Sequence, residues 1–353
     1  MDLRLLVATG HADDFSANEY WITRAATTLC GLLATGLLAQ IFTSGATTHV
    51  LIAVAFAKAV DSIADLAVGW HYRFEQTDRV AQSYAARGAL MLVSIVFGLT
   101  VGNSLTFGLL MGAVLNSVWL GLVEWRRIAG ITLLGRHKGL SLLRVALPLG
   151  VVGGLGSLAS GVPRYFLGGC SSDIELTAFG CCASAMQLLT MSGVAAQQAI
   201  SPRIADHCQT DDAGALKTLR LVAVLTPLLA LLACAAAAIA GGTMLGIVYG
   251  PDYRAYTGTI VVMVIAASVF AGRGFLATAL TANQRTGCQA AIVIASCCVA
   301  IALGPVLIPR YGAFGASLVV LATATVSLVL HAAVILADTS DINVARRAAQ
   351  RSC

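Results

Sequence analysis

The sequence predicts an all-α polytopic membrane protein with about ten transmembrane helices. Hydrophobic residues make up 58% of the 353 residues and charged residues only 11%, and the mean hydropathy is +0.84. A soluble domain has about 25% charged residues, because its surface must be hydrated. The second observation is a series of apolar stretches of roughly 20 residues, the length at which a helix spans a bilayer.

These apolar stretches follow one another along the whole chain. Helices fit them better than barrel strands, which are about ten residues of alternating polarity. The stretch LLALLACAAAAIAGG, for example, is apolar on every side. In chain order the predicted spans are 25–44, 48–69, 84–103, 104–124, 142–162, 176–198, 218–240, 257–281, 287–308 and 313–337.

The second span differs from the others because ionisable groups lie near its middle. Lys58, Asp61 and Asp65 interrupt the stretch between Thr48 and Trp70. At about 100° of rotation per residue, these three side chains share one narrow helix face. A charge within the bilayer is costly unless it faces a bundle interior or a water-filled cavity. We therefore expect this face to line a substrate pathway. An internal ion pair between Lys58 and Asp61 is the alternative.

The longest basic connection divides the chain into two parts. It is weakly amphipathic and is expected to lie at the membrane surface. Four predicted spans precede it and six follow. The predicted organisation is an N-terminal lobe over 1–125, a linker over 126–141, a C-terminal lobe over 142–340 and a tail over 341–353. No glycine-rich phosphate loop of the form GxxxxGK[ST] occurs in the sequence, which argues against an ATP-driven pump.

The distribution of basic residues indicates how the chain is oriented across the membrane. With the N-terminus in the cytoplasm, 17 Lys and Arg fall on the cytoplasmic side, 3 fall outside, and Lys58 and Arg273 lie within spans. This split follows the positive-inside rule and predicts that both termini are cytoplasmic. The outside set is Arg164, Arg254 and Arg310, and the cytoplasmic set is Arg4, Arg24, Arg73, Arg79, Arg87, Arg126, Arg127, Arg136, Lys138, Arg144, Arg203, Lys217, Arg220, Arg285, Arg346, Arg347 and Arg351.

Three further polar residues are candidates for the substrate pathway. Arg273 lies within the eighth span, Gln187 within the sixth, and Arg164 at the outer end of the fifth. Arg273 can supply a positive charge to the pathway or extend to the membrane surface, and Arg164 can act at the outer gate of the pathway. A glutamine can bond to sugar hydroxyls or simply join two helices.

Several other classes of site are not expected. The ten cysteines contain no CxxC pair, and most are interpreted as small apolar side chains, so no metal or cofactor is expected. No basic face with interleaved aromatic residues occurs, so nucleic-acid binding is not indicated.

Four motifs, in this order and spacing, carry a resemblance to a known family. They are KAVDSIADLAVGWHYRFEQTDRVAQSYAARGAL, VPRYFLGGCSSDIELTAFGCCASAMQLLTMSGVAAQQAISPRIADH, MLGIVYGPDYRAYTGTIVVMVIA and LIPRYGAFGASLV, in which Gly312 and Gly315 open the last helix. The chain resembles the Wzx-type polysaccharide (O-antigen) flippases. These belong to the multidrug/oligosaccharidyl-lipid/polysaccharide exporter superfamily, which also holds the MATE exporters.

The resemblance implies a MATE-like two-lobe bundle and a transporter, not an enzyme. The expected activity is alternating-access flipping of a lipid-linked oligosaccharide or polysaccharide precursor across the bacterial inner membrane. The expected partners are the lipid-linked glycan, membrane lipids, and the polymerase and glycosyltransferases of the same pathway. The family has twelve helices, and the first two find no counterpart, which implies an incomplete N-terminal lobe. A MATE-like small-molecule exporter and a truncated, inactive member of the family are the alternatives.

Overall fold

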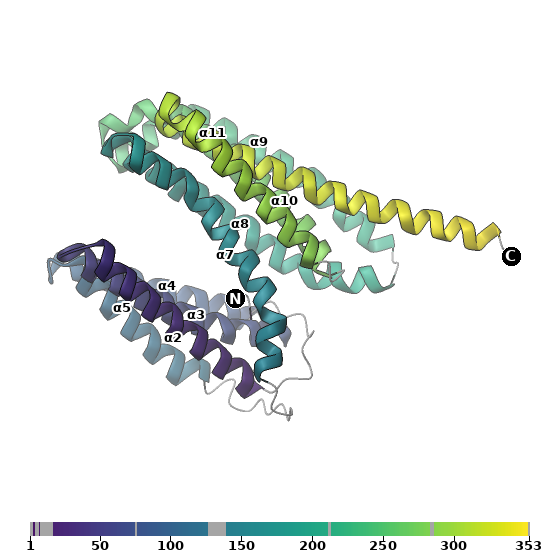
Figure 1. Ribbon diagram of the computed structural model, residues 1–353, viewed down its shortest axis with the longest axis horizontal. Coiled ribbons are helices and arrows are strands. Elements are labelled where there is room, and N and C mark those ends of the chain that lie inside the picture. The colour runs from purple at the N-terminus through teal and green to yellow at the C-terminus, as the bar shows by residue number, and fades with distance from the viewer. Residues whose placement is uncertain are drawn as a thin grey trace. The chain divides into compact units, whose positions relative to one another are not determined.

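The computed structural model describes residues 3, 7, 17–74, 76–125, 139–210, 213–282 and 286–351 (Figure 1). Within these ranges the secondary structure is helical and no strand occurs, which confirms the predicted all-α fold class. The chain forms two compact units, Met1–Gly150 and Val151–Cys353. Most of the predicted linker, 126–138, lies outside the described residues.

The first unit is built around one helix that touches all its neighbours. α3 packs against α2, α4 and α5, and α4 and α5 form a close pair (Figure 1). Gly45, with φ 65°, allows the short turn between α2 and α3. The helices are α2 (Ala17–Phe42), α3 (Ala46–Arg73), α4 (Thr77–Thr100) and α5 (Leu105–Trp119), which continues as a π-helical turn, η1 (Leu120–Glu124).

Small residues set the spacing between α4 and α5. A Cβ placed on Gly108 would lie 2.9 Å from the Ser94 carbonyl oxygen, and one on Gly98 would overlap the backbone of Gly108. Such close helix contacts are typical of membrane proteins, in which van der Waals packing drives association. The α4–α5 pair is therefore tightly packed, whereas α4 makes far fewer contacts with α3.

The second unit is centred on α10, which packs against α8, α9 and α11. The elements are α7 (Gly139–Cys170), which begins before the unit boundary, α8 (Asp173–Thr210), α9 (Ala213–Val248), the 3-10 turn η2 (Pro251–Tyr256), α10 (Thr257–Ala282) and α11 (Thr286–Arg351). A large apolar core joins these helices, and its most buried members include Leu167, Phe179, Met263, Ile308 and Val319.

A single residue divides α11 in two. Gly312 has φ 54° and ψ −132°, outside the helical region, and helix continues on both sides of it. A side chain is strained at such a φ, so glycine is required there. The sequence predicts a loop at the motif LIPRYGAFGASLV. The structure narrows that loop to one residue, because helix extends from the first half of α11 as far as the glycine.

Each of the ten predicted spans falls on a helix, with two of them in α11, but several helices extend eight or more residues beyond the predicted bounds. Seven segments are long and apolar enough to cross a membrane among the described residues, and they do not include α3, which carries Lys58, Asp61 and Asp65. The chain is a multi-pass membrane protein. The seven segments are Ala17–Phe42, Thr77–Thr100, Leu105–Glu124, Asp173–Val194, Leu231–Val248, Pro251–Ala277 and Gly287–Ala337.

Candidate functional site

The charged face of α3 is only partly enclosed by the first unit. The Lys58 side chain is 76% exposed and that of Asp61 is 34% exposed, while Asp65 is half-buried. Lys58 Nζ lies 3.6 Å from Asp61 Oδ2, so the ion pair that the sequence offers as an alternative is present. An exposed cation in mid-span is costly if it faces lipid. We therefore expect the Lys58 side of α3 to face water and not lipid.

Asp61 has a closer partner in Arg87, a residue that the sequence places in a cytoplasmic connection. Arg87, on α4, donates from Nη2 to Asp61 Oδ1 at 2.8 Å, and its side chain is only 8% exposed. Its guanidinium also lies 5.7 Å from the centre of the Tyr84 ring. In the orientation derived from the basic residues, Arg87 belongs to the cytoplasmic set, but the structure places it inside the bundle. The signal that would have found it is its position four residues into the predicted span 84–103.

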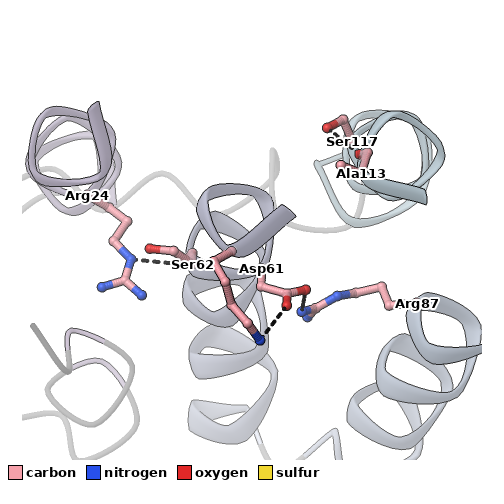
Figure 2. Close-up of polar contacts among 7 residues, drawn as sticks. Arg24, Asp61, Ser62, Arg87, Ala113 and Ser117 are labelled. Atoms are coloured by element: carbon pink, nitrogen blue, oxygen red, sulfur yellow. Dashed lines mark hydrogen bonds and ion pairs between the residues drawn. The ribbon is translucent and has the colours of Figure 1, made fainter. Parts of the chain in front are cut away.

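The Asp61 carboxylate thus lies between two cations, Lys58 on its own helix and Arg87 on the next (Figure 2). Two positive charges and one negative charge leave this cluster with a formal charge of +1. Buried charges are stable only when paired and hydrogen-bonded. The arrangement therefore has an excess of positive charge that an anion can balance.

A second arginine joins α2 to the opposite side of α3 (Figure 2). Arg24 Nε donates to the Ser62 carbonyl oxygen at 2.7 Å. The hydroxyls of Thr28 and Ser62 are 3.1 Å apart. These contacts fix the rotation of α3, because Ser62 must face α2 while the neighbouring Asp61 faces α4.

A buried histidine–carboxylate pair lies at the other end of α3. His71 Nε2 and Glu124 Oε2 are 2.7 Å apart, and the two side chains are 3% and 0% exposed. His71 Nδ1 lies 3.1 Å from Gln76 Oε1. One ring nitrogen of His71 therefore faces the Gln76 amide and the other faces the Glu124 carboxylate. This pair ties α3 to η1, and sequence reasoning missed it because the partners are far apart in the chain.

Arg273, in the second unit, has a different environment. It is half-buried; its Nη1 donates to Ser327 Oγ at 3.4 Å, and its guanidinium lies 5.0 Å from the centre of the Phe270 ring. His331 is buried, and its Nδ1 donates to the Ser327 carbonyl oxygen at 2.7 Å. Among the described residues, no carboxylate forms an ion pair with Arg273. The second unit therefore also holds a cation without an acidic partner in the described chain.

The two remaining predicted residues lie on the surface of the second unit. Arg164 is exposed on α7 and Gln187 is exposed on α8. Neither hydrogen-bonds to Arg273, the third predicted residue of this unit. The part of the chain that the structure describes contains no group of three metal-ligating side chains.

A carboxylate near the break in α11 has a structural role. Glu175, in the first turn of α8, accepts from the backbone N–H of Ala313, the residue after Gly312. It also lies beside the Tyr256 hydroxyl of η2. A carboxylate at a helix N-terminus satisfies N–H groups that lack intrahelical partners. Glu175 thus caps the second half of α11 and links three elements of the unit.

Comparisons with known proteins show the fold. No family model matches the sequence, and no curated protein matches it either. The structure is similar to a solved structure, the outward-facing conformation of a multidrug resistance MATE family transporter of the MOP superfamily. The TM-score is 0.67 at 11% sequence identity, and the match covers 98% of this chain and 82% of that chain. At this identity the likeness establishes the helical architecture and not the substrate.

Proposed function

We propose that this protein is a transporter that moves a lipid-linked oligosaccharide or polysaccharide precursor across the bacterial inner membrane. One observation carries the choice of substrate: Asp61 lies between Lys58 on α3 and Arg87 on α4, so these three side chains together carry a formal charge of +1. Lipid-linked sugars carry a phosphate or diphosphate between tail and glycan. A cationic cluster at mid-span suits that anionic group.

The similarity to a MATE transporter supports transport by alternating access. In such a mechanism two bundles of helices rock about a site near the middle of the membrane. The apolar tail of the substrate stays in the lipid while its polar head crosses. The protein supplies a hydrated surface with cations for the phosphate and amides for the sugar hydroxyls. Lys58, Asp61, Asp65, Arg273, Gln187 and Arg164 are the residues proposed to contact the substrate.

Export of small organic cations is the second candidate. The solved structure with this fold is that of a multidrug transporter, and Asp61 and Asp65 are carboxylates on a single helix face. A cationic substrate requires these carboxylates to be available for binding. In the structure, however, Asp61 already has two cationic partners. The geometry therefore supports an anionic substrate better than a cationic one.

A transport assay separates the two candidates. The purified full-length chain is reconstituted into phosphatidylcholine vesicles that contain a fluorescent, diphosphate-linked lipid sugar. A membrane-impermeant reductant then measures how fast the probe changes leaflet. We expect accelerated exchange in the wild type and a loss in Lys58→Glu, with Arg79→Glu at the exposed Arg79 on α4 as the charge-matched control. Ethidium export without movement of the lipid sugar would instead establish the organic-cation exporter, and movement of neither would indicate an inactive chain.

We further propose that both termini face the cytoplasm, with the polymerase and glycosyltransferases of the pathway as partners. The distribution of basic residues in the sequence supports the orientation. Cys170, exposed at the end of α7, is expected on the outer side. A membrane-impermeant maleimide applied to intact cells should label a variant that retains only Cys170, and should not label one that retains only Cys353. The reverse pattern would invert the proposed topology.

A further inference from the structure

We propose that the seam between α3 and α4 binds a phosphate or diphosphate group, with Arg87 as its principal ligand. The proposal rests on the proposed function, whose substrate is anionic, and it assigns the anion to a residue outside the predicted set. Arg87 is 7% exposed. Its hydrogen bonding, its polar neighbours and the packing of α4 all favour this assignment.

The guanidinium of Arg87 is incompletely used. Asp61 accepts from Nη2 alone, while Nε and Nη1 are buried and have no hydrogen-bond partner among the described residues. A guanidinium presents five N–H donors in a planar fork. Buried donors without partners are unfavourable, and native proteins rarely keep them. A side chain needed only to neutralise Asp61 would not leave two of its three nitrogens unpaired.

Two neighbouring polar groups are in the same condition. Ser83 Oγ, one helical turn before Arg87 on α4, is buried without a partner in the described chain, and so is Asn116 Oδ1 on α5. The contact of Met91 with Gly112 fixes how the antiparallel α4 and α5 face each other. One turn further along both helices, Arg87 and Asn116 reach the same level. Arg87 and Asn116 therefore lie at one depth, with Ser83 one helical turn away, as a phosphate followed by sugar hydroxyls requires.

The seam lies along the lightly packed side of α4. α4 is held to α5 through Gly98 and Gly108 and packs only lightly against α3. α5 packs closely against both α4 and α3, so α4 is held beside α3 mainly through α5, and the Arg87–Asp61 bond bridges the lightly packed line between α3 and α4. Lys58 lies at the exposed edge of the same line, 3.6 Å from Asp61.

Asp61 is then a built-in competitor for the anion. A phosphate that enters the seam replaces the Asp61 oxygen on Arg87, and Arg87 can bind two phosphate oxygens at once. Asp61 keeps Lys58 as its cation, so neither carboxylate nor phosphate is left unpaired. The formal charge of +1 shared by Lys58, Asp61 and Arg87 attracts an anionic group to this exchange.

The test measures anion binding without transport. The full-length chain in phosphatidylcholine nanodiscs is titrated with inorganic pyrophosphate and with farnesyl diphosphate, and binding is followed by calorimetry. We expect Arg87→Gln to weaken binding about tenfold or more, the loss of a charge-assisted hydrogen bond. Arg87→Lys should retain part of the affinity because it keeps the charge but not the fork. Asp61→Asn should bind more tightly, and the exposed control Arg79→Gln should equal the wild type.

The two probes and the lipid identify the source of the anion. Equal losses with both probes assign recognition to the diphosphate itself. Competition by phosphatidylglycerol added to the nanodiscs assigns it to anionic lipid headgroups in general. Wild-type affinity in Arg87→Gln, or weakened binding in Asp61→Asn, would overturn the proposal. If Arg87→Gln fails to fold, the direction of the Asp61→Asn effect decides alone.

The transport assay keeps the two proposals separate. Flipping of the lipid-linked sugar together with anion binding that is insensitive to Arg87 would refute this site and leave the transport function standing. Anion binding that depends on Arg87, with no flipping by the wild type, would support this site and refute the transport function.

Discussion

The first unit, Met1–Gly150, holds charged pairs in its interior, whereas the second unit, Val151–Cys353, is built around an apolar core. In the first unit the buried apolar clusters are small, and the contacts between helices include Arg87 with Asp61 and His71 with Glu124. In the second unit α8, α10 and α11 share one large cluster. The two units thus use different means to join the same type of element.

This difference between the units indicates in which of them a functional site is expected. Between helices in lipid, apolar burial gives little driving force, so close packing and polar contacts determine the arrangement. Among the described residues of the second unit, a closely packed apolar core and the contacts of Glu175 serve that purpose. Charged pairs cost more to bury than apolar side chains of the same size. Their concentration in the first unit therefore indicates a role beyond holding helices together.

The largest effect on stability is expected when the buried His71–Glu124 pair of the first unit is broken. His71→Leu removes the imidazole that lies 2.7 Å from the buried Glu124 carboxylate, and we expect a loss of about 4 kcal/mol in the free energy of unfolding. Denaturant unfolding in detergent micelles measures this loss. The double variant with Glu124→Leu also removes the buried carboxylate and should recover most of the stability. Equal instability of the single and double variants would show that packing, and not charge, is responsible.

The second prediction concerns the break at Gly312 in α11 of the second unit. In Gly312→Ala, a side chain meets a φ of 54° and its Cβ overlaps the Glu175 carboxylate. Strain and overlap together should cost about 3 kcal/mol, seen as a lower melting temperature in detergent. Gly180→Ala, in α8, is the matched control, because a Cβ there has no atom within 4 Å. A melting temperature unchanged in both variants would mean that the break at Gly312 is not required.

A third prediction tests the close packing of α4 on α5. Gly108→Ala introduces a Cβ 3.0 Å from Ile95 Cα and should destabilise the protein by about 2 kcal/mol. The control is Gly88→Ala on α4, whose Cβ has open space; it should change stability by about 1 kcal/mol or less, in the favourable direction. Thermal inactivation of binding in nanodiscs provides the measurement. Similar behaviour of the two variants would contradict the tight α4–α5 pair.

The smallest expected effect on stability concerns Lys58. Its side chain is 76% exposed, so Lys58→Gln should change the free energy of unfolding by about 0.5 kcal/mol or less. The same variant should slow flipping of the lipid-linked sugar, whereas Lys58→Arg should retain part of it. A Lys58→Gln variant that loses stability but transports normally would show that Lys58 has only a structural role. That result would weaken the contrast between the two units.

The sequence by itself determined the membrane class, the approximate positions of the helices and the helix that carries ionisable groups. These are local properties. Apolar length decides whether a segment spans a bilayer, and the rotation per residue places Lys58, Asp61 and Asp65 on one face. The glycine at position 312 was also readable as the start of the last helix.

Only the tertiary structure decided which charges meet. Asp61 and Arg87 are 26 positions apart, His71 and Glu124 are 53 apart, and Glu175 caps a helix that begins 138 positions later. Each pairing depends on the depth and the rotation of one helix relative to another. Helical periodicity specifies neither, because any rotation about the helix axis preserves the pattern. The contacts of all the packed helices together fix those two quantities, and with them the partners of each buried charge.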